Sequence, residues 1–172
     1  MNHLRTFVLI IFTAMITLPA IVESQELPKD EKSGFFSYHE VVKVDSISAD
    51  ELYSRAKPWI ALTYKSANDV IQLDDQNAGR IIVKGNFEII YYANQAWVNH
   101  TLTIDFKEGR YRYDLTSFVF DNGQWSAPLE DEKKFWGQKK KLHKQVSERA
   151  NAIILALREA MQEASSSTDD DW

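Results

Sequence analysis

Histidine is the side chain that most often serves as a general acid, a general base or a metal ligand near neutral pH. Beyond the N-terminal segment the sequence offers three, His39, His100 and His143. They fall in three different predicted elements, and neither a His-x-x-x-His pair nor a His-Glu-x-x-His motif occurs. A zinc site would need them to converge with a carboxylate. We therefore expect ordinary imidazoles, with His100 on an inward-facing strand position.

Adjacent carboxylates occur at residues 74–75, 130–132 and 169–171. A glycosidase needs two carboxyl groups facing each other across a cleft, roughly 5–10 Å apart, which neighbouring acids in turns and tails do not indicate. The Asp-Asp-Gln-Asn segment at 74–77 loosely resembles a calcium loop, but it lacks the required Gly and closing Glu, so a turn is expected. A Gly-x-Ser-x-Gly motif is absent, and so is cysteine. The sequence thus predicts no catalytic residue, no cofactor and no metal ligand.

The formal net charge of the chain is −5, which disfavours a nucleic-acid partner because phosphate binding needs clustered Lys and Arg. One basic cluster stands out at Lys133, Lys134, Lys139, Lys140, Lys141 and Lys144. It fits a solvated helix face, or alternatively an attraction to anionic lipid or polysaccharide.

The N-terminus has the layout of a secretory signal. Arg5 supplies a positive charge, Thr6–Ile21 contains no charged residue, and small residues follow at Ala20 and Ser24, where cleavage is predicted. The alternative is a retained membrane anchor, although the apolar run is shorter than the ~20 residues that a spanning helix needs. Cleavage would leave a periplasmic or secreted product that meets the membrane only through residues 1–24.

The rest of the chain divides into three parts by composition. Residues 25–33 are polar and predict a flexible leader, and residues 165–172 predict a solvated acidic tail. Aromatic residues make up 12% of the sequence, which is too much bulky apolar mass for a disordered chain. One folded domain is therefore expected over residues 34–164.

Hydrophobic periodicity predicts the elements of this domain. Alternating patterns predict five strands, over residues 36–45, 70–73, 80–92, 97–106 and 110–120. A helix begins after Ser48, which forms a capping box with Glu51, and contains Pro58. A second helix is expected from near Glu132 to near Ala164, with Gly137 as a possible break. The order is β-α-β-β-β-β-α, an α+β fold in two layers, with an antiparallel sheet and both helices on one face.

Local irregularities within the strands are also predicted. Gly85 lies on an inward-facing position and indicates a bulge or a close helix contact. The inward phase changes between Leu115 and Phe118, so a bulge is expected near Thr116-Ser117. Turns are expected at 93–95, at Lys107-Glu108-Gly109 and at Asn122-Gly123.

Four segments carry a family resemblance, at residues 38–45, 48–59, 70–75 and 79–85. They contain the capping box, an in-helix Trp59 and an acidic turn at fixed spacing. With them the chain resembles a family of exported domains from Gram-negative bacteria, of unknown function and with a TBP-like fold. The resemblance implies a saddle-like antiparallel sheet backed by two helices, and it implies no reaction and no cofactor.

The sheet face opposite the two helices is the most informative predicted surface. By strand parity it carries His39, Lys43, Lys84, Asn86, Glu88, Ile90, Tyr92, Trp97, Asn99, Thr101, Thr103, Arg110 and Arg112. Flat apolar area mixed with hydrogen-bonding groups is typical of a recognition surface, although a plain solvated face has similar stray apolar residues.

Three functions remain open on the sequence. The first is a non-enzymatic binding or interaction module that contacts an unknown envelope protein or ligand, with Tyr92 and Trp97 as anchors and Asn99, Arg110 and Arg112 as polar contacts. The second is a small envelope hydrolase built around His39 or His100 with a nearby carboxylate. The third is a module that self-associates through a strand edge.

Overall fold

A computed structural model describes residues 26–64 and 67–162. The strands are β1 (Tyr38–Lys43), β2 (Ile71–Asp75), β3 (Arg80–Tyr91), β4 (Asn94–Lys107), β5 (Arg110–Asp121) and β6 (Ser126–Pro128). The helices are α1 (Ala49–Thr63), the short α2 (Ala67–Val70), the 3₁₀ turn η1 (Glu132–Phe135) and α3 (Lys139–Gln162). The predicted α+β class and antiparallel sheet are confirmed, and β6, α2 and η1 are additions that the sequence pattern did not predict.

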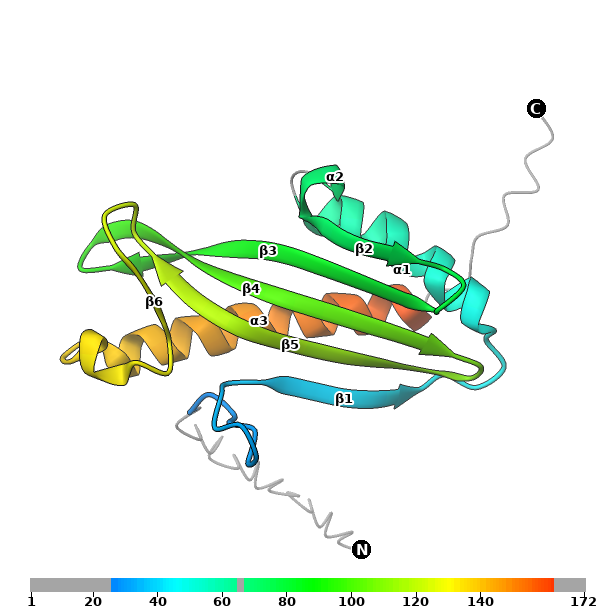
Figure 1. The fold of residues 1–172 in the computed structure, drawn as a ribbon, viewed down its shortest axis with the longest axis horizontal. Coiled ribbons are helices and arrows are strands. Elements are labelled where there is room, and N and C mark those ends of the chain that lie inside the picture. Colours follow the sequence, from blue (N-terminus) through cyan, green and yellow to red (C-terminus); the bar gives the residue numbers. More distant parts are fainter. Residues whose placement is uncertain (1–25, 65–66, 163–172) are drawn as a thin grey trace, which may run out of the picture.

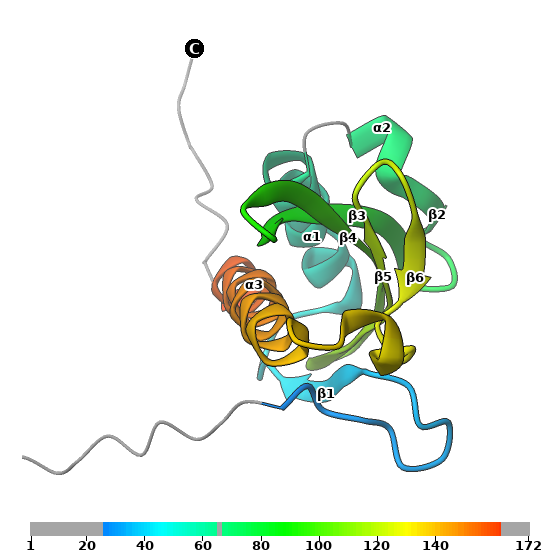
Figure 2. The ribbon, with the colours of Figure 1, turned by 90° about the vertical axis from the view of Figure 1, so that its left-hand side faces the viewer.

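The strands form one antiparallel sheet in the order β1-β5-β4-β3-β2, and β6 pairs with β5 beyond the end of β1. Figure 1 shows α3 lying along the sheet, and Figure 2 shows α1 and α3 together on one side of it. Both long helices therefore cover the same face, as predicted, and leave the opposite face of the sheet open.

The core lies between this sheet and the two helices. On β4 every second side chain from Ala96 to Phe106 is buried, which is the period of a strand with one face in the core. On β5 the buried positions run through Leu115 and resume at Phe118. The register of β4 with β5 shifts there, and Ser117 has φ 58°, so the predicted bulge is confirmed.

Helix α1 begins where the sequence predicts it. The backbone N–H of Glu51 donates to the Ser48 hydroxyl at 3.1 Å, an N-cap contact. Glu51 itself pairs with Arg55 at 2.9 Å rather than reaching back to complete the capping box. Pro58 lies inside the helix as expected.

The start of the last helix differs from the prediction, which placed it near Glu132. Residues 132–135 form the 3₁₀ turn instead, and Gly137 breaks the chain with φ 81°, so α3 begins at Lys139. A lysine in the first turn opposes the helix dipole. The Glu132 carboxylate offsets this because it pairs with Lys139 at 2.5 Å and with Lys29 at 3.1 Å.

Two further boundaries differ from the sequence prediction. The β3–β4 turn consists of Tyr92 and Ala93, both with positive φ, so β4 begins at Asn94 and not at 97. At the N-terminal side, Leu27 is only 3% exposed, and the N–H of Ser37 donates to the Pro28 carbonyl at 2.9 Å. The folded part therefore extends into the segment assigned to a flexible leader. The predicted signal segment 1–24 and tail 165–172 lie outside the described residues.

Gly85 of β3 lies against Tyr64, the residue that caps the end of α1. A Cβ built on it would lie 2.1 Å from Cε1 of Tyr64 and 3.2 Å from Nε2 of His100. The Tyr64 hydroxyl and His100 Nε2 are 3.1 Å apart, and both side chains are buried. The close helix contact predicted from Gly85 is thus real, and it is made by the aromatic residue that ends the helix.

Candidate binding surface

The open face of the sheet carries the outward side chains of β1, β3, β4 and β5. Trp97 is 37% exposed on it, and Val41 and Ile90 are exposed apolar residues of the same parity. Cross-strand registers place these positions in rows, one of which joins Glu88, Trp97 and Asp121. Within the described residues no helix was found that is long and apolar enough to cross a bilayer.

The five predicted contact residues lie far apart along the sheet, and one of them lies in a turn. Trp97 and Asn99 lie near one end of β4, whereas Arg112 is opposite Asp105 near the other. The eight positions between Trp97 and Asp105 correspond to about 26 Å of strand. Tyr92 is exposed in the hairpin turn, with its hydroxyl 3.9 Å from the position of a Cβ on Gly137. It lies toward the start of α3 rather than beside Trp97.

The three histidines also lie apart. His39 is exposed on β1, where it is the register partner of Asp114. His100 is 2% exposed and stacks on Phe87, which confirms the prediction that it is buried. His143, on α3, is buried with its ring edge against Phe36. Across the described ranges 26–64 and 67–162, no histidine forms an ion pair with a carboxylate, and no group of three potential metal ligands occurs.

One Ser-x-x-Lys spacing does occur in the chain, at Ser54 and Lys57 of α1. In serine acyl-transferases of that motif the lysine activates the hydroxyl. Here Lys57 pairs instead with Asp74 of β2, and Ser54 is exposed on the helix surface. The spacing therefore reflects helix composition rather than a nucleophile.

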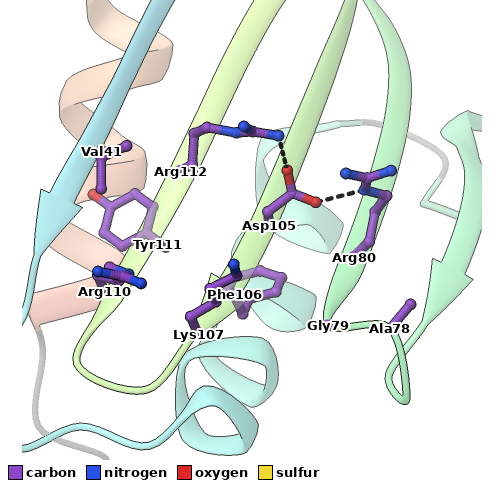
Figure 3. Close-up of a pocket in the computed structure, with 10 residues that line it drawn as sticks. All are labelled: Val41, Ala78, Gly79, Arg80, Asp105, Phe106, Lys107, Arg110, Tyr111 and Arg112. Atoms are coloured by element: carbon purple, nitrogen blue, oxygen red, sulfur yellow. Dashed lines mark hydrogen bonds and ion pairs between the residues drawn. The ribbon is translucent and has the colours of Figure 1, made fainter.

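A cavity of about 390 Å³ opens on the open face at the β4–β5 hairpin end of the sheet, and we call it the cationic pocket. Figure 3 shows its lining. It is bounded by Val41, Ala78, Gly79, Arg80, Asp105, Phe106, Lys107, Arg110, Tyr111 and Arg112. Four cationic side chains thus surround one carboxylate, in a protein whose overall charge is negative.

The carboxylate at the centre of the cationic pocket holds two arginines in place. Nε of Arg80 donates to one oxygen of Asp105 at 2.5 Å, and Nη2 of Arg112 donates to the other at 2.5 Å (Figure 3). The Asp105 side chain is only 16% exposed. Burial alone would raise the pKa of Asp105, but the hydrogen bonds and charges of Arg80 and Arg112 outweigh it and hold that pKa below its usual value.

A row of three cations lies two residues from the Asp105–Arg112 pair, toward the β4–β5 turn. Arg110 of β5 is the register partner of Lys43 on β1 and of Lys107 on β4. All three side chains are exposed. In the part of the chain that the structure describes, none of them has a carboxylate within the 4.0 Å of an ion pair. Three like charges therefore lie side by side across neighbouring strands.

Replacing Asp105 with Asn tests whether this carboxylate organises the pocket. We expect the free energy of unfolding at pH 7 to fall by about 1 kcal/mol, because two charge-assisted hydrogen bonds weaken while solvent screens the half-exposed arginines. Asp114→Asn is the matched control, since Asp114 pairs with Arg112 alone, at 3.2 Å.

Urea unfolding at pH 7 and near pH 3 measures both variants. Because the folded pKa of Asp105 is lowered, its contribution is present above about pH 3.8 and lost as the pH falls below that value. The difference between wild type and Asp105→Asn should therefore shrink in acid. An equal cost for the two variants at pH 7 would contradict a special role for Asp105.

Sequence reasoning named Arg110 and Arg112 but missed Arg80, Lys107 and Asp105 as parts of the same site. The signal was present in part, because a two-residue turn at Glu108-Gly109 places Lys107 opposite Arg110 and Asp105 opposite Arg112. Lys43 joins the site through the pairing of β1 with β5, and no turn between these two strands predicts that pairing.

Comparisons with known proteins agree with this fold. A family model described as a domain of unknown function (DUF4468) with TBP-like fold matches residues 38–121. A crystal structure of a TBP-like protein from Parabacteroides distasonis has a TM-score of 0.69 at 16% identity, with 83% of this chain and 99% of that chain covered. A DUF4468 family protein from Bacteroides ovatus gives a TM-score of 0.67 at 16% identity, with 84% and 94% covered. Among curated proteins, none matches this sequence.

Proposed function

We propose that this protein, whose residues 38–121 belong to the DUF4468 family of domains with a TBP-like fold, is a non-enzymatic binding module that contacts its partner through the open face of its sheet. The family match confirms the resemblance to a domain of unknown function with a TBP-like fold. It supplies the fold and no activity, so the proposal depends on the surface itself.

The observation that carries the proposal is the uncovered sheet face. Both long helices pack on the other side, and the open side presents Trp97, Val41 and Ile90 among polar and charged neighbours. Exposed aromatic and aliphatic side chains on a rigid sheet lose little conformational entropy on binding, which suits them as anchors. The cationic pocket adds a concave feature at one end of the same face.

The alternative, a small hydrolase, lacks support from the positions of the histidines. A general base needs a hydrogen-bonded partner that orients it and a substrate within reach. His100 contacts the Tyr64 hydroxyl deep in the core, and His143 packs under Phe36. The exposed His39 forms no ion pair with a carboxylate within the described residues, and none of the three histidines lines the cationic pocket. The binding module is therefore the better interpretation of the surface.

The place where the module works is proposed from the sequence alone. The charge-free run at Thr6–Ile21 behind Arg5 supports export, followed by cleavage after Ala20 or Ser24. The partner would then be an envelope protein or ligand, met in the periplasm or outside the cell.

Site-specific photo-cross-linking in the producing cells tests the contact surface. A photoreactive phenylalanine at Trp97 or Val41 should yield a cross-linked adduct, because both positions lie on the open face. The same residue at Leu155, which is exposed on α3, is the matched control and should yield none. Adducts from Leu155 alone, or none from either position on the open face, would refute the proposal.

A further inference from the structure

We propose that the cationic pocket binds a polyanion, a ligand or pendant group that carries two or more carboxylate or phosphate groups. This inference rests on the proposed function, because it assigns a ligand class to one end of the open face. Three observations support it: the row of cations, the arginines that Asp105 holds in place, and the size of the cavity.

The first step is the electrostatic cost of the cation row. Like charges directly opposite each other on neighbouring strands destabilise a sheet. Strand spacing of about 4.8 Å places Lys43, Arg110 and Lys107 within a span of about 10 Å. None of the three forms an ion pair within the described residues, so a bound anion would relieve the repulsion between them.

The acids nearest to the row in sequence are engaged elsewhere or form no ion pair with it. Glu108 lies in the turn between Lys107 and Arg110, but its carboxylate accepts a hydrogen bond from the backbone N–H of Ala49 at 3.2 Å. Asp45, two residues after Lys43, forms no ion pair in the described part of the chain. The row therefore remains available to a ligand from solvent.

The second step is preorganisation of the neighbouring arginines. Asp105 fixes the guanidinium groups of Arg80 and Arg112, on strands that flank β4, with its two oxygens (Figure 3). Guanidinium groups recognise carboxylate and phosphate in fixed, often bidentate geometry, and a held side chain loses less entropy on binding. Arg112 also pairs through Nε with Asp114 at 3.2 Å. A guanidinium carries five N–H groups, so each arginine keeps N–H groups for a ligand beyond its bonds to these carboxylates.

The third step is the size of the cavity. A volume of about 390 Å³ suits a small polyanion or the charged end of a larger molecule, and Val41 supplies an apolar wall. Carboxylate and phosphate are both oxyanions that these cations can bind. An experiment must therefore distinguish a phosphate ligand from a carboxylate ligand.

Titration calorimetry of the full chain with pyrophosphate and with citrate, at low ionic strength, tests the site. Wild type should bind at least one of them, and Arg110→Gln should weaken that binding by about tenfold, because the central cation of the row is lost. Arg149→Gln, an exposed arginine on α3, is the matched control and should bind as wild type does. Binding of pyrophosphate alone assigns phosphate, and binding of citrate alone assigns carboxylate.

A second readout guards against a purely structural effect. Without ligand, Arg110→Gln should unfold at a higher temperature than wild type, by roughly 2–4 °C, because removing the central charge relieves the repulsion. Failure of both anions to bind, or equal binding to wild type and Arg110→Gln, would overturn the inference. If cross-linking from Trp97 persists in that case, the contact surface stands and only the ligand class falls.

Discussion

Gly85→Ala should destabilise the domain by about 3 kcal/mol or more, a large fraction of the stability of a domain this size. Alanine is ordinarily the better residue in a strand interior, because glycine loses more backbone entropy on folding. Here the added methyl would lie 2.1 Å and 2.6 Å from two ring carbons of Tyr64, far inside contact distance. The ring is 5% exposed and also packs edge-on against Trp59, so it has little room to move away.

A double-mutant cycle isolates this clash. Tyr64→Ala removes the ring, so Gly85→Ala in that background should cost far less than in wild type, with a coupling energy of roughly 2 kcal/mol. Gly123→Ala is a useful reference, since a Cβ there meets nothing within 4 Å and the cost reflects only its positive φ of 82°. Chemical denaturation measures the four proteins of the cycle and the Gly123→Ala reference. Equal costs for Gly85→Ala with and without the Tyr64 ring would show that the ring is not the obstacle.

Gly85 also marks how far sequence reasoning reaches in this protein. Local patterns were sufficient where a feature depends on neighbours in the chain: the N-cap at Ser48, the tight turn at Glu108-Gly109 and the bulge at Ser117 all appear as predicted. An inward glycine predicts a close approach, but the pattern does not name the approaching residue. Tyr64 lies 21 positions away, and only the path of α1 across the sheet brings it to Gly85.

The candidate site shows the same division between local and non-local signals. Hairpin register alone brings Arg110 and Arg112 beside Lys107 and Asp105. The third cation of the row, Lys43, comes from the pairing of β1 with β5, in which Lys43 and Arg110 are 67 residues apart in the sequence.

Two sequence predictions differ from the structure near residues with a left-handed backbone. Tyr92 was assigned to the open face by counting along β3, but the chain turns at that residue with φ 47°. The last helix was expected to begin near Glu132, with Gly137 as a possible break. Residues 132–135 form a 3₁₀ turn instead, and α3 begins at Lys139, two residues after Gly137 with its φ of 81°. In both cases a residue in the left-handed backbone region interrupts the regular element.

Acid should destabilise the domain well before its carboxylates are protonated, because of His100. Burial among Tyr64, Phe87 and Phe118 lowers the pKa of His100 to about 4, against 6.5 in an exposed histidine. Between about pH 4 and 6.5, His100 is therefore mostly protonated in the unfolded chain and mostly neutral in the folded domain. Stability is fully present above about pH 6.5 and is lost as the pH falls toward 4, by about 3 kcal/mol in total. Carboxylates with lowered pKa, such as Asp105, contribute to the loss only at still lower pH.

His100→Gln should flatten most of this dependence between pH 7.5 and 5, although the variant starts from a lower stability because glutamine fills the site less well. Burial also lowers the pKa of His143, so a residual slope should remain and disappear in the double variant His100→Gln/His143→Gln. Tyr64→Phe is the matched control: it removes the hydroxyl 3.1 Å from Nε2 but keeps the buried imidazole, so its slope should persist. Urea unfolding at several pH values gives each slope directly.

Parallel pH profiles for wild type and His100→Gln would mean that the imidazole is protonated or hydrated inside the folded domain. The dense ring cluster around it argues against that, because an imidazolium there would lack both water and a carboxylate to offset its charge.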